Sequence, residues 1–127
     1  TLDLSDSPDL LPVVACLAVY SEGVTEIKGI LHARFKESDR PLVIARELSK
    51  AGVKVRFSGD TLEITGGRFR GGLLDPENDH RLFMAFTVMG LASKEPVRVR
   101  GVGVEADSYP AFIRDLLRLG ADLEVVG

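Results

Sequence analysis

A chain of 127 residues is long enough for one domain with a hydrophobic core, and its hydrophobic fraction of 45 % and charged fraction of 28 % are typical of a globular protein. A net charge of −3 argues against a general nucleic-acid binder, because such domains carry a basic excess. The longest apolar run, Leu10–Val19, is too short to span a bilayer, and the acidic start over residues 1–9 is unlike a signal peptide, so we expect a cytoplasmic protein that binds neither nucleic acid nor membrane.

The first half of the chain predicts a mixed pattern of two helices and four strands. Periodicity and turn signals give these elements in order: a strand near Leu2–Leu4, a helix over Pro8–Tyr20, a strand over Val24–Ile30, a helix over Asp39–Ala51, and strands over Val53–Phe57 and Leu62–Thr65. Pro41 falls in the first turn of the second helix, where its missing N–H costs nothing. The turn Ser58-Gly59-Asp60 joins the last two strands and predicts a hairpin.

The second half predicts a similar order of elements. They are a strand near Phe69–Leu74, a helix over Asp79–Ala92, a strand over Val97–Val104, a helix over Pro110–Leu119 and a last strand over Ala121–Val126. Two pairs of segments resemble each other in the same order along the two halves: 21–30 with 93–102, and 48–55 with 116–123. This similarity suggests two copies of one unit, about 1–66 and 67–127.

The predicted helices are of two kinds. The first helix of each unit is apolar on every side, over Leu10–Val19 and over Leu82–Ala92, and such a helix must be surrounded by protein. The second helices are amphipathic. We therefore predict an α/β (α+β) fold with buried helices inside and with sheets and amphipathic helices outside them. Cys16, the only cysteine, lies in an apolar run and is interpreted as a buried structural thiol rather than a nucleophile.

Two clusters of charged residues stand at the starts of predicted helices, at 36–40 and 79–81. Unpaired backbone N–H groups and the helix dipole favour an anion at such a start. Capping accounts for the short acceptors there: Ser38, Asp39 and Asp79. It does not account for Lys36 and Arg40, whose positive charges are unfavourable at a helix start unless an anion or a carboxylate joins them. The clusters therefore predict a site for phosphorylated or carboxylated ligands.

Five more residues could belong to this site. Arg81 opens an apolar helix that offers it little water, and a buried guanidinium needs a carboxylate or phosphate partner. Glu37 either carries protons or complements the helix dipole, and Asp9 either caps its helix or lies at a mouth shared with the cationic clusters. His32 and His80 either contact a ligand or lie at the surface. Two histidines and one cysteine without ligand spacing predict no metal site.

These motifs, in their order, resemble a known family. The chain contains Lys36-Glu37-Ser38-Asp39-Arg40, Asn78-Asp79-His80-Arg81, Ser108-Tyr109-Pro110 and Leu119-Gly120-Ala121. This combination is similar to the C-terminal part of the 5-enolpyruvylshikimate-3-phosphate synthase (3-phosphoshikimate 1-carboxyvinyltransferase) family, across nearly the whole chain but a minority of the family's length. The resemblance implies repeated βαβαββ units around buried parallel helices. Residues 1–127 would then be a single partial lobe that lacks its N-terminal partner lobe.

The resemblance also implies an activity. The family transfers the enolpyruvyl group of phosphoenolpyruvate to the 5-hydroxyl of shikimate 3-phosphate, in the shikimate pathway of aromatic amino-acid biosynthesis, and no cofactor is expected. For the proton transfers it implies that Asp9 contacts the shikimate hydroxyls and accepts a proton, and that Glu37 donates one. For binding it implies that Arg40 and Arg81 hold phosphoenolpyruvate, with His80 beside them. Lys36 would lie near both substrates, and His32 would make a polar substrate contact.

One position departs from the family pattern. Asp107 stands where the family usually has a lysine, and an aspartate would repel the carboxylate of phosphoenolpyruvate, so it is left out of the site. Two alternatives remain: a non-catalytic anion-binding or scaffold module of the same fold, or a relative that acts on a UDP-amino sugar, although residues 36–40 favour the shikimate branch. We expect the isolated piece to be inactive, because open water would weaken each charge interaction without the opposite wall of the cleft.

Overall fold

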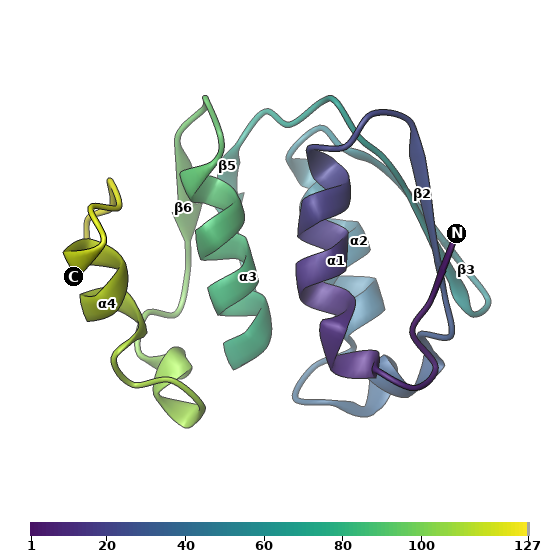
Figure 1. The fold of residues 1–127 in the computed structure, drawn as a ribbon, viewed down its shortest axis with the longest axis horizontal. Coiled ribbons are helices and arrows are strands. Elements are labelled where there is room, and N and C mark those ends of the chain that lie inside the picture. Colours follow the sequence, from purple (N-terminus) through teal and green to yellow (C-terminus); the bar gives the residue numbers. More distant parts are fainter. Residues whose placement is uncertain (127) are drawn as a thin grey trace.

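The computed structural model describes residues 1–126, and its helices and strands alternate along the chain (Figure 1). Its elements are β1 Leu2–Asp3, α1 Leu11–Val19, β2 Val24–Lys28, α2 Arg40–Lys50, β3 Lys54–Ser58, β4 Thr61–Thr65, β5 Gly72–Leu74, α3 His80–Leu91, β6 Val97–Val99 and α4 Phe112–Arg118. Short 3₁₀ turns stand at Pro8–Leu10, Leu31–Phe35 and Val104–Asp107. The mixed helix and sheet composition agrees with the predicted α/β class.

The first half forms a four-stranded sheet in the order β1-β2-β4-β3. β1 runs parallel to β2, while β4 is antiparallel to both β2 and β3. The predicted hairpin is confirmed, since β3 and β4 pair from Ser58↔Thr61 to Lys54↔Thr65 around Gly59, whose φ of 59° suits a glycine. The carboxylate of Asp60 in this turn accepts three successive backbone N–H groups, from Gly29 (3.1 Å), Ile30 (2.7 Å) and Leu31 (2.9 Å). Asp60 thus fixes the path by which the chain leaves β2 for the charged cluster at 36–40.

The helices α1 and α2 cover one face of this sheet, and the core lies between them. Apolar side chains of the sheet and of both helices are fully enclosed there: Ile27, Leu62 and Ile64 from the strands, and Leu11, Ala15, Ile44 and Leu48 from the helices. Cys16 is buried as predicted, and burial raises the pKa of its thiol to about 12. A thiol with so high a pKa carries almost no thiolate at neutral pH, which agrees with a structural role.

α1 and α3 lie side by side and run in the same direction (Figure 1). Their starts meet where Arg81 approaches Asp9 at 3.9 Å, and their ends meet where the hydroxyl of Tyr20 donates to the carbonyl of Met89 at 2.6 Å. α3 connects β5 to β6, which pair in parallel from Gly72↔Val97 to Leu74↔Val99. Each of the parallel helices therefore follows a first strand and leads back to a strand that pairs with it.

The two central helices are not enclosed on every side by the described residues. α1 and α3 leave an apolar groove of about 290 Å³ between them. Side chains that line it remain half exposed or more, including Val13, Leu17 and Val88. The expectation that protein surrounds these helices is therefore met on the sheet side and along their mutual contact, but not along this groove.

The second half departs from prediction at its end. The strand expected over Val97–Val104 stops at Val99, because residues 100–103 form a bend and a turn, with positive φ values of 90° at Gly101 and 110° at Gly103, which lead into the 3₁₀ helix Val104–Asp107. The strand expected over Ala121–Val126 is wrong: this segment pairs with no neighbour in the part of the chain that the structure describes, and it has no regular secondary structure. Its apolar pattern favours a strand, yet β5 and β6 form only a two-stranded sheet that it does not join.

Candidate functional site

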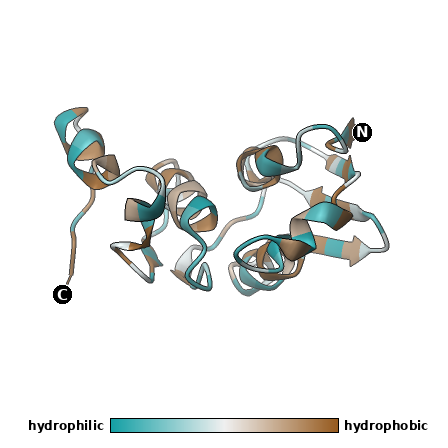
Figure 2. Cartoon of the chain, turned by 90° about the horizontal axis from the view of Figure 1, so that it is seen from below, coloured by the Kyte–Doolittle hydropathy of each residue, from teal (hydrophilic) through white to brown (hydrophobic). Residues whose placement is uncertain are grey.

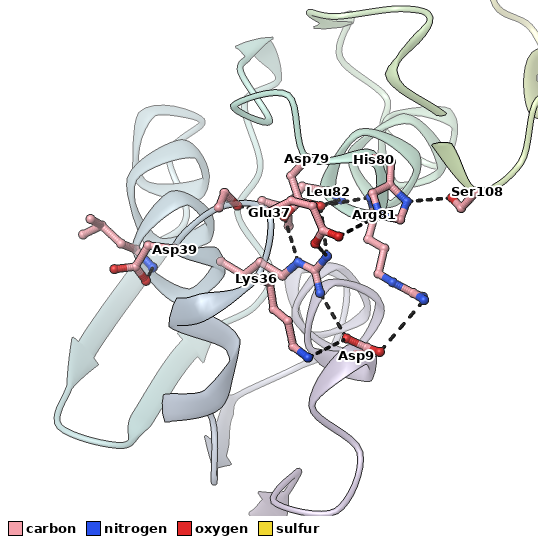
Figure 3. Close-up of polar contacts among 12 residues, drawn as sticks. Asp9, Lys36, Glu37, Asp39, Asp79, His80, Arg81, Leu82 and Ser108 are labelled. Atoms are coloured by element: carbon pink, nitrogen blue, oxygen red, sulfur yellow. Dashed lines mark hydrogen bonds and ion pairs between the residues drawn. The ribbon is translucent and has the colours of Figure 1, made fainter. Parts of the chain in front are cut away.

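The starts of three helices converge on one end of the molecule and bring most of the predicted site residues together (Figure 3). Asp9 lies in the 3₁₀ turn that precedes α1, Lys36 and Glu37 precede α2, and His80 and Arg81 open α3. Figure 2 views the chain from this end, and hydrophilic residues colour many of the turns and helix starts that face the reader. These residues are up to 72 positions apart in the sequence, from Asp9 to Arg81, so only the parallel packing of α1 and α3 makes them neighbours.

Side-chain caps fix where α2 and α3 begin. Asp39 accepts from the N–H of Leu42 at 3.4 Å, and Asp79 accepts from the N–H groups of Arg81 at 3.0 Å and Leu82 at 3.3 Å. The capping roles predicted for both aspartates are confirmed. An aspartate at the N-cap satisfies N–H groups that lack an intrahelical partner and complements the helix dipole.

The loop before α3 is held in an uncommon backbone conformation. Glu77 and Asn78 have φ values of 56° and 58°, in the left-handed region that residues other than glycine rarely adopt. The buried carboxylate of Glu47 on α2 accepts from the N–H of Asp75 at 2.7 Å, and Arg46 pairs with Glu77 at 2.9 Å. Burial alone would raise the pKa of Glu47, but Lys50 and Arg46 hold it below its usual value. α2 therefore anchors the loop that delivers Asp79, His80 and Arg81.

Arg40 is the centre of the cluster, and its side chain is only 1 % exposed. Its Nε donates to Oδ2 of Asp79 at 2.8 Å, and its Nη2 approaches Oδ1 of the same carboxylate at 3.3 Å. Its two terminal nitrogens also donate outward, Nη1 to Asp9 at 3.1 Å and Nη2 to Glu37 at 2.7 Å. One edge of the guanidinium thus faces the interior, and the other faces carboxylates that are about half exposed.

Lys36 and Arg81 complete the ring of cations around Asp9. Their side-chain nitrogens lie 3.8 Å and 3.9 Å from the Asp9 carboxylate. The sequence prediction that Arg81 is the buried guanidinium is wrong, because its side chain is 44 % exposed and Arg40 is the enclosed one. The charges within this group balance formally, three against three: Lys36, Arg40 and Arg81 against Asp9, Glu37 and Asp79.

Glu37 and His80 form a second polar chain beside the cations. Nε2 of His80 lies 3.4 Å from Oε1 of Glu37, and Nδ1 of His80 lies 2.6 Å from the hydroxyl of Ser108. The pKa of Glu37 is below its ordinary value, first because the carboxylate accepts from its own backbone N–H and then because His80 and Arg40 stabilise the charged form, while burial opposes them. At neutral pH this site therefore contains an ionised Glu37 next to the ring of His80.

Two residues lie outside this group: His32, which the sequence predicts to be in the site, and Asp107, which it does not. His32 is exposed in the 3₁₀ turn Leu31–Phe35, and within residues 1–126 no polar contact joins it to the cluster. Asp107, which departs from the family pattern, is also exposed, at the end of the 3₁₀ turn Val104–Asp107. The structure thus brings together Asp9, Lys36, Glu37, Arg40, His80 and Arg81, and leaves His32 apart.

Sequence reasoning missed three members of the network. Their residue types predict only caps for Asp79 and Ser38, yet Ser38 donates to Asp79 at 2.8 Å and Asp79 binds Arg40. Ser108 belongs to a family motif, and the sequence does not show that it reaches His80. The argument that a buried guanidinium needs a carboxylate pointed to the right chemistry. It was applied to Arg81 because the sequence does not tell which arginine is enclosed.

The described residues offer neither a metal site nor a membrane-spanning helix. Across residues 1–126, no three histidine, cysteine, aspartate or glutamate side chains are grouped so that they could hold a metal ion. Within the same range, no helix has the length and apolar character needed to cross a membrane.

Comparison with known proteins gives one consistent result. The sequence model of the family EPSP synthase (3-phosphoshikimate 1-carboxyvinyltransferase) matches residues 1–116. The 3-phosphoshikimate 1-carboxyvinyltransferase of Aeropyrum pernix is 47 % identical over 125 residues, which are 98 % of this chain and 29 % of that protein. The enzyme of the same name from Korarchaeum cryptofilum is 45 % identical over 123 residues, 96 % of this chain and 29 % of that protein.

Solved structures agree. The EPSP synthase from Acinetobacter baumannii superposes with a TM-score of 0.87 at 31 % identity, over 95 % of this chain and 29 % of that one. The enolpyruvyl transferase NikO from Streptomyces tendae superposes with a TM-score of 0.70 at 27 % identity, over 90 % of this chain and 25 % of that one. This chain spans about 29 % of the length of the curated relatives it matches. From the sequence match and the shared fold, the chain belongs to the EPSP synthase (3-phosphoshikimate 1-carboxyvinyltransferase) family.

Proposed function

We propose that this chain is the C-terminal part of an enzyme that transfers the enolpyruvyl group of phosphoenolpyruvate to the 5-hydroxyl of shikimate 3-phosphate. The observation that carries the proposal is the meeting of Lys36, Arg40 and Arg81 with two carboxylates, Asp9 and Glu37, at the starts of parallel helices. Cations bind the two multiply charged substrates, and carboxylates move the protons of the reaction. Family membership supports the same substrates and the same reaction.

Each group has a part in this proposal. Arg40 and Arg81 hold phosphoenolpyruvate, Lys36 lies between the substrates, and His80 and His32 make further polar contacts with them. Asp9 accepts the proton of the attacking hydroxyl, and Glu37 delivers a proton to C3 of the enol as the tetrahedral intermediate forms. Phosphate then leaves, and C3 returns its proton so that the enol ether is regenerated.

Substrate binding itself prepares Glu37 as an acid. In the free site the pKa of Glu37 lies below its ordinary value, so the group is ionised at neutral pH. A multiply charged anion on Arg40 competes with Glu37 for the guanidinium and places like charge beside its carboxylate, and both effects raise the pKa. His80, 3.4 Å away, is the neighbour best placed to exchange the proton.

The rest of the longer protein supplies what this piece lacks. The charges of the cluster in this piece balance one another, so additional cations from an N-terminal lobe are needed to hold two multiply charged anions in a closed cleft.

We assign the repeat units to about 1–66 and 67–127, since each contains a strand–helix–strand unit with parallel strands. Its single cysteine, buried and unpaired, is compatible with work in the cytoplasm.

Asp107 favours a second candidate, a non-catalytic anion-binding module of the same fold. A carboxylate at a position where the family usually has a lysine weakens binding of phosphoenolpyruvate. Asp107 lies on the exposed side of the 3₁₀ turn Val104–Asp107, so a cation from elsewhere in the full-length protein can substitute for the missing lysine. Activity is then retained.

Phosphate release by the full-length protein separates these candidates. With phosphoenolpyruvate and shikimate 3-phosphate together, the full-length protein is expected to release phosphate, and residues 1–127 alone are expected to release none. A full-length protein that binds phosphoenolpyruvate, seen as NMR shifts of amides near Arg40 and Arg81 that Arg81→Ala abolishes, but releases no phosphate would favour the non-catalytic module. Turnover by the isolated piece would contradict the need for a second lobe.

A further inference from the structure

Asp79 is the most completely enclosed carboxylate next to the site, with a side chain that is 0 % exposed. Five donors approach its two oxygens. Oδ2 accepts from Ser38 Oγ and from Arg40 Nε, both at 2.8 Å. Oδ1 accepts from the N–H groups of Arg81 and Leu82 and is approached by Nη2 of Arg40. A carboxylate has about four lone-pair positions, so this one is fully occupied by protein donors.

A simple helix cap would bind only backbone N–H groups at the start of its own helix. Asp79 caps α3 but also grips Arg40, which is 39 positions earlier and opens α2. Burial would raise the pKa of Asp79, but the hydrogen bonds from Arg40 and Ser38 and the charge of Arg40 hold it below its ordinary value. The pair is therefore ionic at neutral pH, and the two-point contact fixes the plane of the guanidinium.

This contact decides which edge of Arg40 is available to a ligand. Asp79 takes the edge formed by Nε and Nη2 from the interior side. The nitrogens Nη1 and Nη2 then point toward Asp9 and Glu37, whose carboxylates are about half exposed. An incoming anion meets Arg40 only along this outer edge, in an orientation that Asp79 sets.

We propose that Asp79 is a positioning residue for the anionic substrate. It pairs with Arg40 on the interior side, fixes the plane of the guanidinium and so directs the outer edge of Arg40 toward phosphoenolpyruvate. The inference rests on the proposed function in that Arg40 receives this substrate. It adds a residue that acts through Arg40 without touching the substrate. Ser38 supports the same carboxylate from the cluster at 36–40.

The test uses the full-length protein and the substitution Asp79→Asn. Asparagine has the same shape and is an equally good N-cap, so the cap of α3 remains while the negative charge is lost. We expect the KM for phosphoenolpyruvate to rise about 10- to 100-fold, by comparison with the loss seen when the hydrogen-bond partner of a metal-ligating side chain is changed. The KM for shikimate 3-phosphate should change far less, because Asp79 contacts neither Lys36 nor Asp9 directly.

Asp39→Asn is the matched control. Asp39 is also an N-cap aspartate, on the neighbouring helix α2, but it pairs with the partly exposed Arg34 at 3.0 Å, and Figure 3 shows it apart from Asp9 and Arg81. It should leave the KM for phosphoenolpyruvate unchanged. If Asp79→Asn fails to fold, Ser38→Ala replaces it, since this change removes one hydrogen bond from Asp79 and should raise the same KM by a smaller factor.

A second readout does not depend on turnover. The Nε–H signal of Arg40 is assigned in a ¹⁵N spectrum through its loss in Arg40→Lys. Its proton should be protected from exchange with water in the wild-type protein. This protection should be lost in Asp79→Asn but not in Asp39→Asn. A wild-type protein that releases no phosphate would defeat the proposed function, and this resonance would still decide the role of Asp79. An unchanged KM together with an unchanged Nε–H signal in Asp79→Asn would overturn the inference.

Discussion

Among the single residues, Glu37 combines a low pKa with a position half open to solvent. It contacts Arg40 on one carboxylate oxygen and His80 on the other, so it can exchange a proton without moving far. Its contribution is expected to be to the reaction rather than to folding, because an ion pair with one exposed partner stabilises a protein only weakly.

The substitution Glu37→Gln tests this at the residue scale. In the full-length protein we expect kcat to fall about 10²- to 10⁴-fold, the usual effect of removing a general acid, while the free energy of unfolding changes by less than about 0.5 kcal/mol. The measurements are steady-state phosphate release and urea unfolding. Glu22→Gln is the control, since Glu22 is exposed between α1 and β2 and should affect neither quantity. A kcat within tenfold of wild type for Glu37→Gln would rule it out as the proton donor.

Between elements, the Arg40–Asp79 pair joins the start of α2 to the start of α3. Both side chains are almost completely enclosed, so each depends on the other: a buried charge that loses its partner costs several kcal/mol. The folded-state pKa of Asp79 lies below its ordinary value of 3.8. Its contribution to stability is therefore complete above that value and is lost as pH falls through the lower folded-state pKa.

An acid titration of stability checks this connection between α2 and α3. We expect Asp79→Asn to lower the free energy of unfolding of the full-length protein by about 3 kcal/mol near neutral pH. The difference from wild type should begin to shrink as pH falls below about 4, where the Asp79 carboxylate of the unfolded wild type is protonated, and it should vanish once pH has passed the lower folded-state pKa. Urea unfolding at several pH values between neutral and acid gives the two curves. Curves that stay parallel over the whole range would mean that the pKa of Asp79 is the same in the folded and the unfolded protein.

For the molecule as a whole, the described residues leave the apolar groove between α1 and α3 uncovered. Leu17 in the groove is 64 % exposed, and Val24 at the start of β2 is 65 % exposed. The two side chains are equally exposed in this structure, but only Leu17 belongs to a continuous apolar groove between two central helices. Residues of the longer protein that cover the groove would bury Leu17 and Val88 together.

Two substitutions in the full-length protein test whether the groove between α1 and α3 is covered there. Leu17→Gln keeps a good helix former and Val24→Thr keeps a good strand former, so local propensity is similar in both. We expect Leu17→Gln to lower the free energy of unfolding by about 2–3 kcal/mol, because a covered leucine is lost and an amide is buried. Val24→Thr should cost less than about 1 kcal/mol. Equal small effects in urea unfolding would mean that the groove stays open in the full-length protein.

The local part of this structure could be predicted from the sequence. The starts of α2 and α3, the caps formed by Asp39 and Asp79, the hairpin around Gly59 and the burial of Cys16 depend on residues within a few positions of one another, or on simple apolar patterning. The same is true of the charged clusters, whose residue types indicate anion binding before any fold is known.

Only the tertiary structure decided which charged groups are enclosed and which meet. Arg40 rather than Arg81 is buried, Asp79 is its partner across 39 positions, and Ser108 reaches His80 across 28. The segment 121–126 has the apolar pattern of a strand but no neighbouring strand to pair with in the part of the chain described. The physical reason is the same in each case: desolvation and pairing depend on what packs against a residue, and that is set by segments far away along the chain.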